Sequence, residues 1–254
     1  MASTFFGLNI GVSALNSFQV ATNTTANNIA NVKTTGYTRQ SATLTAKDAL
    51  NVTARYGSVG TGVTVTSIKQ QRDLYYDTKY WENNSCYGRY EQKLYYLDQI
   101  QNYFKDNGAS VKGFSSVFSQ MFSDLDTLRS KPSDKTVRNQ FISSAQSLCT
   151  YFNQMSDNLS KLQDDCNEEI RNRVDEINSI SEKISLLNKE INQIETGTGV
   201  EASSLRDERA NLMDNLSKIV NVSYKETPIQ NTNGDNLGGT SFCLFVNGEK
   251  IVDG

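Results

Sequence analysis

Histidine is absent from this 254-residue chain, and proline occurs only twice, as Pro132 and Pro228. The lack of histidine removes the most frequent general base, a common metal ligand and every nucleophile that depends on a histidine. With so few prolines, very long uninterrupted helices are permitted. No apolar run is long enough for a membrane-spanning helix, and the N-terminus lacks the three regions of a signal peptide. These absences argue against an enzyme and against an integral membrane protein.

Cysteine and net charge are also low. The cysteines are Cys86, Cys149, Cys166 and Cys243. They are far apart and form no Cys-x-x-Cys pair, which argues against a zinc ribbon and a redox motif, so free thiols are expected. A net charge of −3 gives no electrostatic reason to bind nucleic acid or an anionic membrane surface. We therefore expect no cofactor, no metal ion, no nucleic acid and no membrane among the partners.

Three other patterns suggest chemistry, and each has a simpler explanation. The glycine cluster Gly57–Gly62 is not followed by Lys-Ser/Thr but by a strand-like alternation at 63–68, so a turn is favoured over a phosphate-binding loop. The acidic residues at 164–165 and 168–169 fall on the polar side of a predicted helix and indicate a solvated face. The tyrosines between Tyr75 and Tyr103 have the spacing of a helix, which favours packing over stacking on sugars or bases. We find no active site.

Apolar residues at steps of three and four predict long helices through the middle of the chain. One is expected over about 73–104, a shorter one over 114–128, and a third over 135–195, which would span roughly 90 Å if unbroken. The expected seam of the first is Tyr87, Tyr90, Leu94, Leu97, Gln101 and Phe104. The seam of the third runs from Phe141 to Ile194 and includes Leu159 and Ile184. Such heptad patterns are typical of a rod of packed helices.

The end of the chain changes character. A glycine-containing break at Thr196–Gly199 ends the long helix, and Ser204-Leu-Arg-Asp207 has the pattern of a capping box that begins another helix. Three strands are then predicted: Asn221–Lys225, Thr240–Val246 and, beyond a hairpin turn at Asn247-Gly248, Glu249–Val252.

The segment before residue 40 has few apolar residues, but they are regularly spaced. One helical face carries Leu8, Val12, Leu15, Phe18, Thr22, Thr25 and Ile29. Such a helix buries too little apolar area to offset its ordering entropy, so we expect it to be helical only against a partner and disordered in the monomer. Gly36 is expected to take the left-handed conformation that ends the helix.

The residues from Ala26 to Gln40 read Ala-Asn-Asn-Ile-Ala-Asn-Val-Lys-Thr-Thr-Gly-Tyr-Thr-Arg-Gln. They resemble the rod-type signature of bacterial flagellar axial proteins, an Asn-Asn-Ile-Ala-Asn core followed by Gly-Tyr-Ser/Thr-Arg-Gln. Further blocks follow in order: Pro132, Arg138, Ala145, Leu148 and Phe152-Asn153; Ile177-Asn178 and Leu187–Ile191; Leu205, Asp207, Arg209, Leu212 and Leu216. This ordered set resembles the flagellar hook-associated protein 1 family over essentially the whole chain.

The resemblance implies a non-enzymatic structural subunit of the bacterial flagellum. Members of the family form a ring between the hook and the filament, which implies self-association and contacts with the hook protein and with hook-associated protein 3. They are secreted uncleaved through the flagellar type III export apparatus and function outside the cell. Their N-terminal helix pairs with a C-terminal helix of the same chain in the axial core. Binding of the dedicated export chaperone depends on the C-terminus in relatives, so it is doubtful for residues 1–254.

The resemblance also assigns two groups of residues. The expected assembly interface in the axial core is Leu8, Leu15, Phe18, Asn27, Asn28, Ile29, Asn31, Gly36, Tyr37, Arg39 and Gln40. The expected structural residues of the family motif are Pro132, Arg138, Leu205, Asp207 and Arg209.

The expected fold is mainly α, an elongated antiparallel coiled coil or helical-bundle rod with a short β segment after the N-terminal helix and the start of a β-rich domain at the C-terminus. Residues 1–40 are expected to form the axial-core helix and signature. Residues 41–220 would form the rod domain, with a small β element near 52–68. Residues 221–254 would begin an outer β domain that is truncated at Gly254.

Two other functions compete with this interpretation. Another flagellar axial subunit, such as a hook or flagellin-like protein, would share the opening signature, although the downstream blocks are more specific. A coiled-coil surface adhesin or adaptor would share the heptads, but it leaves the residues from Ala26 to Gln40 unexplained. An enzyme is a remote third.

Overall fold

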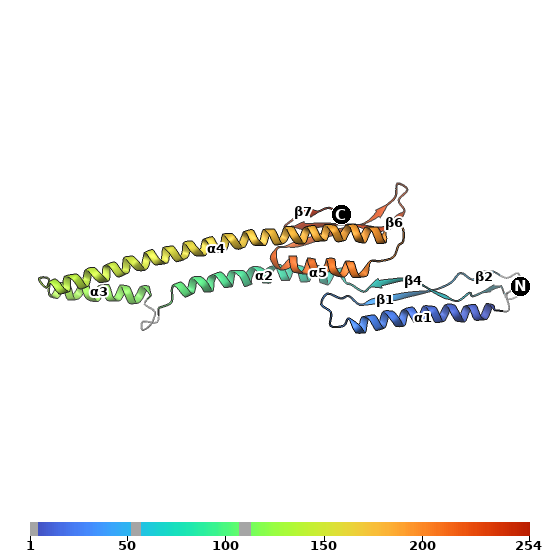
Figure 1. The fold of residues 1–254 in the computed structure, drawn as a ribbon, viewed down its shortest axis with the longest axis horizontal. Coiled ribbons are helices and arrows are strands. Elements are labelled where there is room, and N and C mark those ends of the chain that lie inside the picture. Colours follow the sequence, from blue (N-terminus) through green and yellow to red (C-terminus); the bar gives the residue numbers. More distant parts are fainter. Residues whose placement is uncertain (1–4, 52–56, 107–112) are drawn as a thin grey trace. The chain divides into compact units, whose positions relative to one another are not determined.

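The computed structural model describes residues 5–51, 57–106 and 113–254. Its helices are α1 (Phe6–Ala30), α2 (Leu74–Tyr103), α3 (Phe114–Ser130), α4 (Lys135–Glu195) and α5 (Ser203–Ile219). Its strands are β1 (Gln40–Ala46), β2 (Leu50–Asn51), β3 (Ser58–Val59), β4 (Val63–Gln70), β5 (Val222–Gln230), β6 (Asn236–Val246) and β7 (Glu249–Val252) (Figure 1). The predicted mainly α fold of long helices is confirmed, and the longest of them is unbroken. The chain forms two compact units, one combining Met1–Cys86 with Ile177–Gly254 and the other consisting of Tyr87–Glu176.

In the first unit, the N-terminal part is a helix on a hairpin. Strand β1 pairs antiparallel with β4, from Gln40 opposite Gln70 to Ala46 opposite Val63. Helix α1 packs along this hairpin (Figure 1). Gly62 has a φ of +109°, and a β-carbon there would overlap the Ser13 side chain, so glycine permits the close approach of helix and hairpin. The predicted strand at 63–68 is confirmed.

The apolar core of the first unit lies where α5, the last turns of α4 and the start of α2 meet an antiparallel sheet of order β5-β6-β7. Its buried members are Trp81, Ile180, Ile184, Met213, Leu216, Val222, Phe242, Leu244 and Val252. The φ values of Asn247 and Gly248 are 50° and 92°, so the predicted hairpin turn between β6 and β7 is confirmed. Strands β5 and β6 are longer than predicted.

The second unit consists of the rest of α2, all of α3 and the first part of α4. Phe114 on α3 stacks on Phe118 and contacts Phe152 of α4, with ring centroids 5.1 and 6.0 Å apart. The Tyr96 hydroxyl of α2 donates a 2.6 Å hydrogen bond to Glu169 of α4, and this bond raises the pKa of Tyr96. Aromatic rings and one short hydrogen bond therefore join α4 to its two neighbours.

The seam predicted for α2 is wrong. Tyr87, Tyr90, Leu94 and Leu97 are exposed, and the more covered residues lie on the adjacent face that includes Tyr96. The physical reason is that tyrosine is apolar in its ring and polar at its tip, so a helix rich in tyrosine has no single face that composition marks as buried.

Two predicted helix ends also differ from the structure. Helix α1 ends at Ala30 and not at Gly36, which lies in the following turn. Helix α5 begins after Ala202 and has no side-chain cap, so the capping box at Ser204 is wrong. Instead, the carboxylate of Glu195 on α4 accepts a 2.9 Å hydrogen bond from the Ala202 amide. A carboxylate at the end of the preceding helix therefore bonds the start of α5, where a motif within α5 was expected to do so.

Across the described ranges, no helix is both long and apolar enough to cross a membrane.

Candidate assembly site at the N-terminal segment

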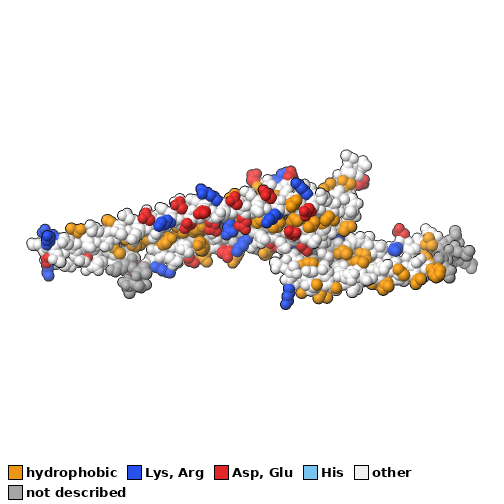
Figure 2. Space-filling view, in the orientation of Figure 1, with side chains coloured by type: hydrophobic (Ala, Val, Ile, Leu, Met, Phe, Trp, Pro, Cys, Tyr) orange, Lys and Arg blue, Asp and Glu red, His pale blue; other side chains and the backbone are white. Residues whose placement is uncertain are grey.

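Helix α1 turns its apolar residues outward. The predicted face is between 46% and 69% exposed at Leu8, Val12, Leu15, Phe18 and Ile29. Figure 2 shows apolar side chains gathered along this helix. The two buried residues of α1 are Ser17 and Thr24, and the Ser17 hydroxyl lies 3.2 Å from the Val63 carbonyl of β4. Against its own hairpin the helix therefore buries only small polar residues fully and covers Ile10 and Val20 in part, and it leaves its apolar stripe uncovered within the described chain.

This division of faces predicts weak order in α1 on its own. Small polar side chains bury little apolar area, which does not offset the ordering entropy of an isolated helix. In dilute purified chain, the amides of residues 8–25 are expected to exchange with solvent at nearly unfolded rates, measured by hydrogen exchange. Amides of Met213 and Leu216 in the apolar core serve as the protected control. Strong protection across residues 8–25 in the monomer would contradict this prediction.

The asparagines of the signature hold the chain after α1 in place. The Asn28 carboxamide oxygen accepts hydrogen bonds from the Tyr37 hydroxyl at 2.8 Å and from the Gln40 amide at 2.9 Å, and its nitrogen donates to the Gln40 carbonyl at 2.8 Å. The Asn27 side chain donates to the Tyr37 hydroxyl at 3.1 Å. Asn31 donates back to Asn27, which extends the last turn. Asn28 therefore ties the end of α1 to the start of β1.

The turn that follows meets α5. Gly36 has a φ of +76°, and a β-carbon there would overlap the side-chain amide of Asn211. The Thr38 amide donates a 3.2 Å hydrogen bond to the Asp207 carboxylate. Burial raises the pKa of Tyr37, and the nearby negative charge of Asp207 raises it further. The turn at Gly36–Thr38, called the signature turn below, is thus packed against α5.

The structure separates the predicted interface residues into two groups. Asn27, Asn28, Asn31, Gly36, Tyr37 and Gln40 come together around the turn, whereas Leu8, Leu15, Phe18, Ile29 and Arg39 point outward. Tyr37 was expected to reach a neighbouring chain, but its hydroxyl is bonded within its own segment. The Arg39 guanidinium is exposed and has no hydrogen-bond or ion-pair partner among the residues that the structure describes.

The predicted motif residues make hydrogen bonds or are buried within the protein. The Arg138 guanidinium donates a 2.7 Å hydrogen bond to the Pro132 carbonyl and braces the turn between α3 and α4. Leu205 is half-buried on α5. Arg209 is 5% exposed, lies 3.9 Å over the Phe242 ring, and donates to Asn188 at 3.0 Å and to Glu226 at 3.3 Å. These contacts make it the centre of a buried charge cluster.

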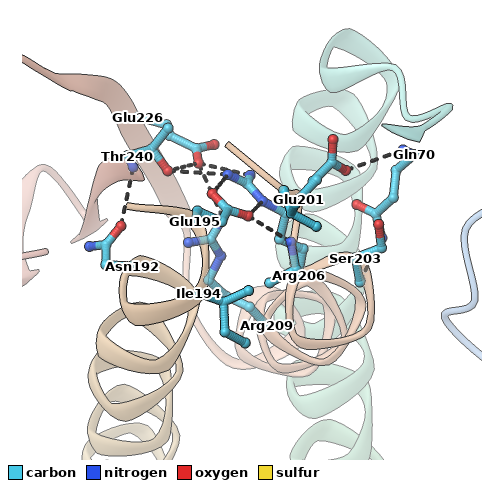
Figure 3. Close-up of polar contacts among 12 residues, drawn as sticks. Gln70, Asn192, Ile194, Glu195, Glu201, Ser203, Arg206, Arg209, Glu226 and Thr240 are labelled. Atoms are coloured by element: carbon cyan, nitrogen blue, oxygen red, sulfur yellow. Dashed lines mark hydrogen bonds and ion pairs between the residues drawn. The ribbon is translucent and has the colours of Figure 1, made fainter. Parts of the chain in front are cut away.

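Figure 3 shows the rest of that cluster, which joins α4, α5, β5 and β6. Arg206 donates to both carboxylate oxygens of Glu195 at 2.7 Å and to Glu226 at 3.0 Å. The Thr240 hydroxyl donates to Glu226 at 2.6 Å. Burial acts to raise the pKa of Glu226, but the Thr240 hydrogen bond and the two arginines outweigh it and lower that pKa. The cluster is internally satisfied, which suits structural support rather than chemistry.

A cavity of about 270 Å³ lies beside the cluster and is lined in part by Trp81, Met213 and Tyr224. Its charged rim includes Arg72, which pairs with Asp77. Within the described ranges, no group of histidine, cysteine, aspartate and glutamate side chains is arranged to hold a metal ion.

The residues of α5 that contact the turn at Gly36–Thr38 were not predicted as a contact site. Asp207 was named only as a motif residue, and Asn211 was not singled out. Asp207 and Asn211 contact a turn that lies more than 160 residues earlier in the chain. No local sequence pattern could have shown this, because only the fold brings the two segments together.

Comparison with known proteins adds two family matches. Residues 97–254 match the flagellar hook-associated protein FlgK helical domain, and residues 8–38 match the flagella basal body rod protein family. The second match covers α1 from Leu8 onward and the whole Gly36–Thr38 turn.

Several curated proteins are similar over most of the chain. Flagellar hook-associated protein 1 of Bacillus subtilis is 33% identical over 234 residues, which is 89% of this chain and 46% of that protein. The protein of the same name from Salmonella typhimurium is 31% identical, over 97% of this chain and 42% of its own length. The chain thus spans less than half the length of these relatives.

The fold is also similar to that of solved structures. The flagellar hook junction protein FlgK from Burkholderia pseudomallei superposes with a TM-score of 0.53 at 21% identity, over 69% of this chain and 28% of that one. At this identity the likeness concerns the fold alone.

Proposed function

This chain belongs to the flagellar hook-associated protein FlgK family, and we propose that it acts as a non-enzymatic structural subunit of the bacterial flagellum at the junction between hook and filament. Residues 1–40 would contribute to the axial core, residues 41–220 would form the helical rod domain, and residues 221–254 would begin an outer β domain. The match of residues 8–38 to the rod protein family supports a separate N-terminal part, whereas the helical-domain match at 97–254 runs across the proposed boundary at residue 220.

The observation that carries the proposal is the outward apolar face of α1. An apolar stripe on a helix whose other face already packs on a hairpin is suited to burial against another chain. The exposed guanidinium of Arg39 lies just beyond the signature turn and can pair with a neighbouring carboxylate or carbonyl. These two features give the N-terminal segment both apolar area and a polar anchor for assembly.

The same proposal names partners and a location. Copies of this chain would associate into a ring, with the hook protein on one side and hook-associated protein 3 on the other. The subunit would be secreted through the flagellar type III export apparatus to the extracellular flagellum.

The proposal predicts an assembly defect without unfolding. Ile29→Ala and Arg39→Ala, introduced separately into the bacterial gene, are expected to give cells with hooks but few filaments and junction protein in the medium. Both side chains are exposed, so the thermal unfolding of the purified variants should match that of the parent. Electron microscopy of the cells and immunoblots of the medium measure the effect.

The matched control is Lys69→Ala, which removes an exposed basic residue of the hairpin outside the signature. Cells with this change should swim normally. Normal swimming of the Ile29 and Arg39 variants, with stable filaments, would overturn the assignment of these residues. Antibody labelling of the protein along the whole filament or hook, and not at one boundary, would instead support another axial subunit.

A further inference from the structure

The N-terminal arm, defined here as residues 5–51 and 57–73, is held to the rest of the first unit by polar contacts. The apolar core of that unit contains none of its residues, since the first core member in the chain is Trp81. The arm meets the segment before α5 and its first turn through Gln70, whose amide donates to Glu201 at 3.2 Å and whose side chain donates to the Ser203 carbonyl at 2.7 Å. It meets the middle of α5 through the signature turn.

The contact between the signature turn and α5 is formed by two residues of α5. Asp207 is 7% exposed and accepts the Thr38 amide with one carboxylate oxygen. One helical turn further on, Asn211 lies against the backbone of Gly36, where there is no room for a β-carbon. Arg72, at the end of the arm, donates to the Thr38 hydroxyl at 3.5 Å. The turn is therefore contacted by α5 and by the arm's own end, and its residues are half-buried.

We propose that Asp207 and Asn211 form a latch that receives the Gly36–Thr38 turn and sets the direction in which α1 leaves the helical part of the first unit. These are positioning residues, and the inference rests on the proposed function because the segment they position is the one that would enter the axial core. The apolar stripe of α1 can dock correctly only if the helix starts from a defined direction.

The polar character of the latch has a mechanical consequence. Hydrogen bonds between protein groups are replaced by hydrogen bonds to water when they open, so opening exposes no apolar core. While the latch is closed the direction of α1 is set, and its opening would free the arm while Met213, Leu216 and their neighbours stay packed.

Hydrogen exchange of the purified chain tests the latch directly. In the parent, the Thr38 amide should be protected even where α1 exchanges freely. Asp207→Ala should raise the exchange rate of that amide by about tenfold and leave core amides of Met213 and Leu216 unchanged. The control is Glu208→Ala, which removes the exposed neighbouring carboxylate on the same helix. An unprotected Thr38 amide in the parent, or equal effects of the two variants, would overturn the proposal.

A double-mutant cycle gives a second test that does not depend on Asp207. Gly36→Ala should disrupt the turn partly by colliding with Asn211, so Asn211→Ala should relieve part of that defect. The combined change in the Thr38 exchange rate is then expected to be about threefold or more below the product of the single changes. Asn215→Ala, at an exposed asparagine one turn away, should give no such relief. Independent, multiplicative effects at 36 and 211 would overturn the latch.

The two proposals can fail separately. Neither exchange experiment requires a flagellum, so it reports on the latch even if the protein has another location. Conversely, a closed latch in solution combined with normal swimming of the Ile29 and Arg39 variants would leave the latch standing and overturn the assembly role of the segment.

Discussion

Replacing Ile184 with alanine is expected to lower the free energy of unfolding by about 2–5 kcal/mol. Ile184 is 0% exposed and lies at the centre of the apolar core, where α4 faces α5 and the sheet. Alanine would remove buried methyl groups and leave a cavity that rigid neighbours fill only in part. Urea unfolding of the purified chain, followed by circular dichroism, measures the change.

Two other positions on α4 make this prediction specific. Glu182 is exposed, and its change to alanine should cost less than about 0.5 kcal/mol. Leu159 belongs to the same predicted seam as Ile184, so periodicity alone predicts the same loss of unfolding free energy for alanine at either position. Leu159 is 37% exposed, however, and the expected loss there is less than about 2 kcal/mol. If Ile184, Leu159 and Glu182 all gave the same small loss, the position of the core would be wrong.

Arg209→Ala is expected to destabilise the first unit by about 3–5 kcal/mol. The substitution removes a buried guanidinium stem from the Phe242 ring and leaves the Asn188 carboxamide oxygen without its donor. It also removes one of the two arginines that pair with Glu226, so that buried carboxylate is less well compensated. Burial lowers the pKa of Arg209, and the negative charge of Glu226 acts in the opposite direction.

The matched control for this prediction is Arg173→Ala. Arg173 makes two ion pairs on α4, with Glu169 and Glu176, but its side chain is half exposed. Surface ion pairs contribute little because water screens them, so the loss should be about 0–1 kcal/mol. Equal losses at 209 and 173, measured by the same urea titration, would contradict a structural role for the buried cluster.

Periodicity predicted the limits of α4, Lys135 and Glu195, and the later part of its seam, where Ile180, Ile184 and Ile191 are buried. Earlier in the helix the predicted seam is wrong at Phe152, Ile170 and Val174, which are between 48% and 56% exposed. The turn at Asn247-Gly248 was equally clear, because both positions need a positive φ that few residues tolerate. Periodicity was insufficient on α2, where tyrosine occupies several faces of the helix and the predicted seam is exposed.

The sequence by itself determined the mainly α class, the long helix, the terminal hairpin and the family to which the signature and later blocks belong. Only the tertiary structure decided which side of α1 is covered, that Asn28 holds Tyr37 and Gln40, and that Asp207 accepts the Thr38 amide instead of capping its own helix. The physical reason is the separation along the chain between the residues that interact. Helix seams and tight turns depend on neighbours within a few residues, whereas a buried polar atom takes whichever partner the whole fold brings within hydrogen-bonding distance.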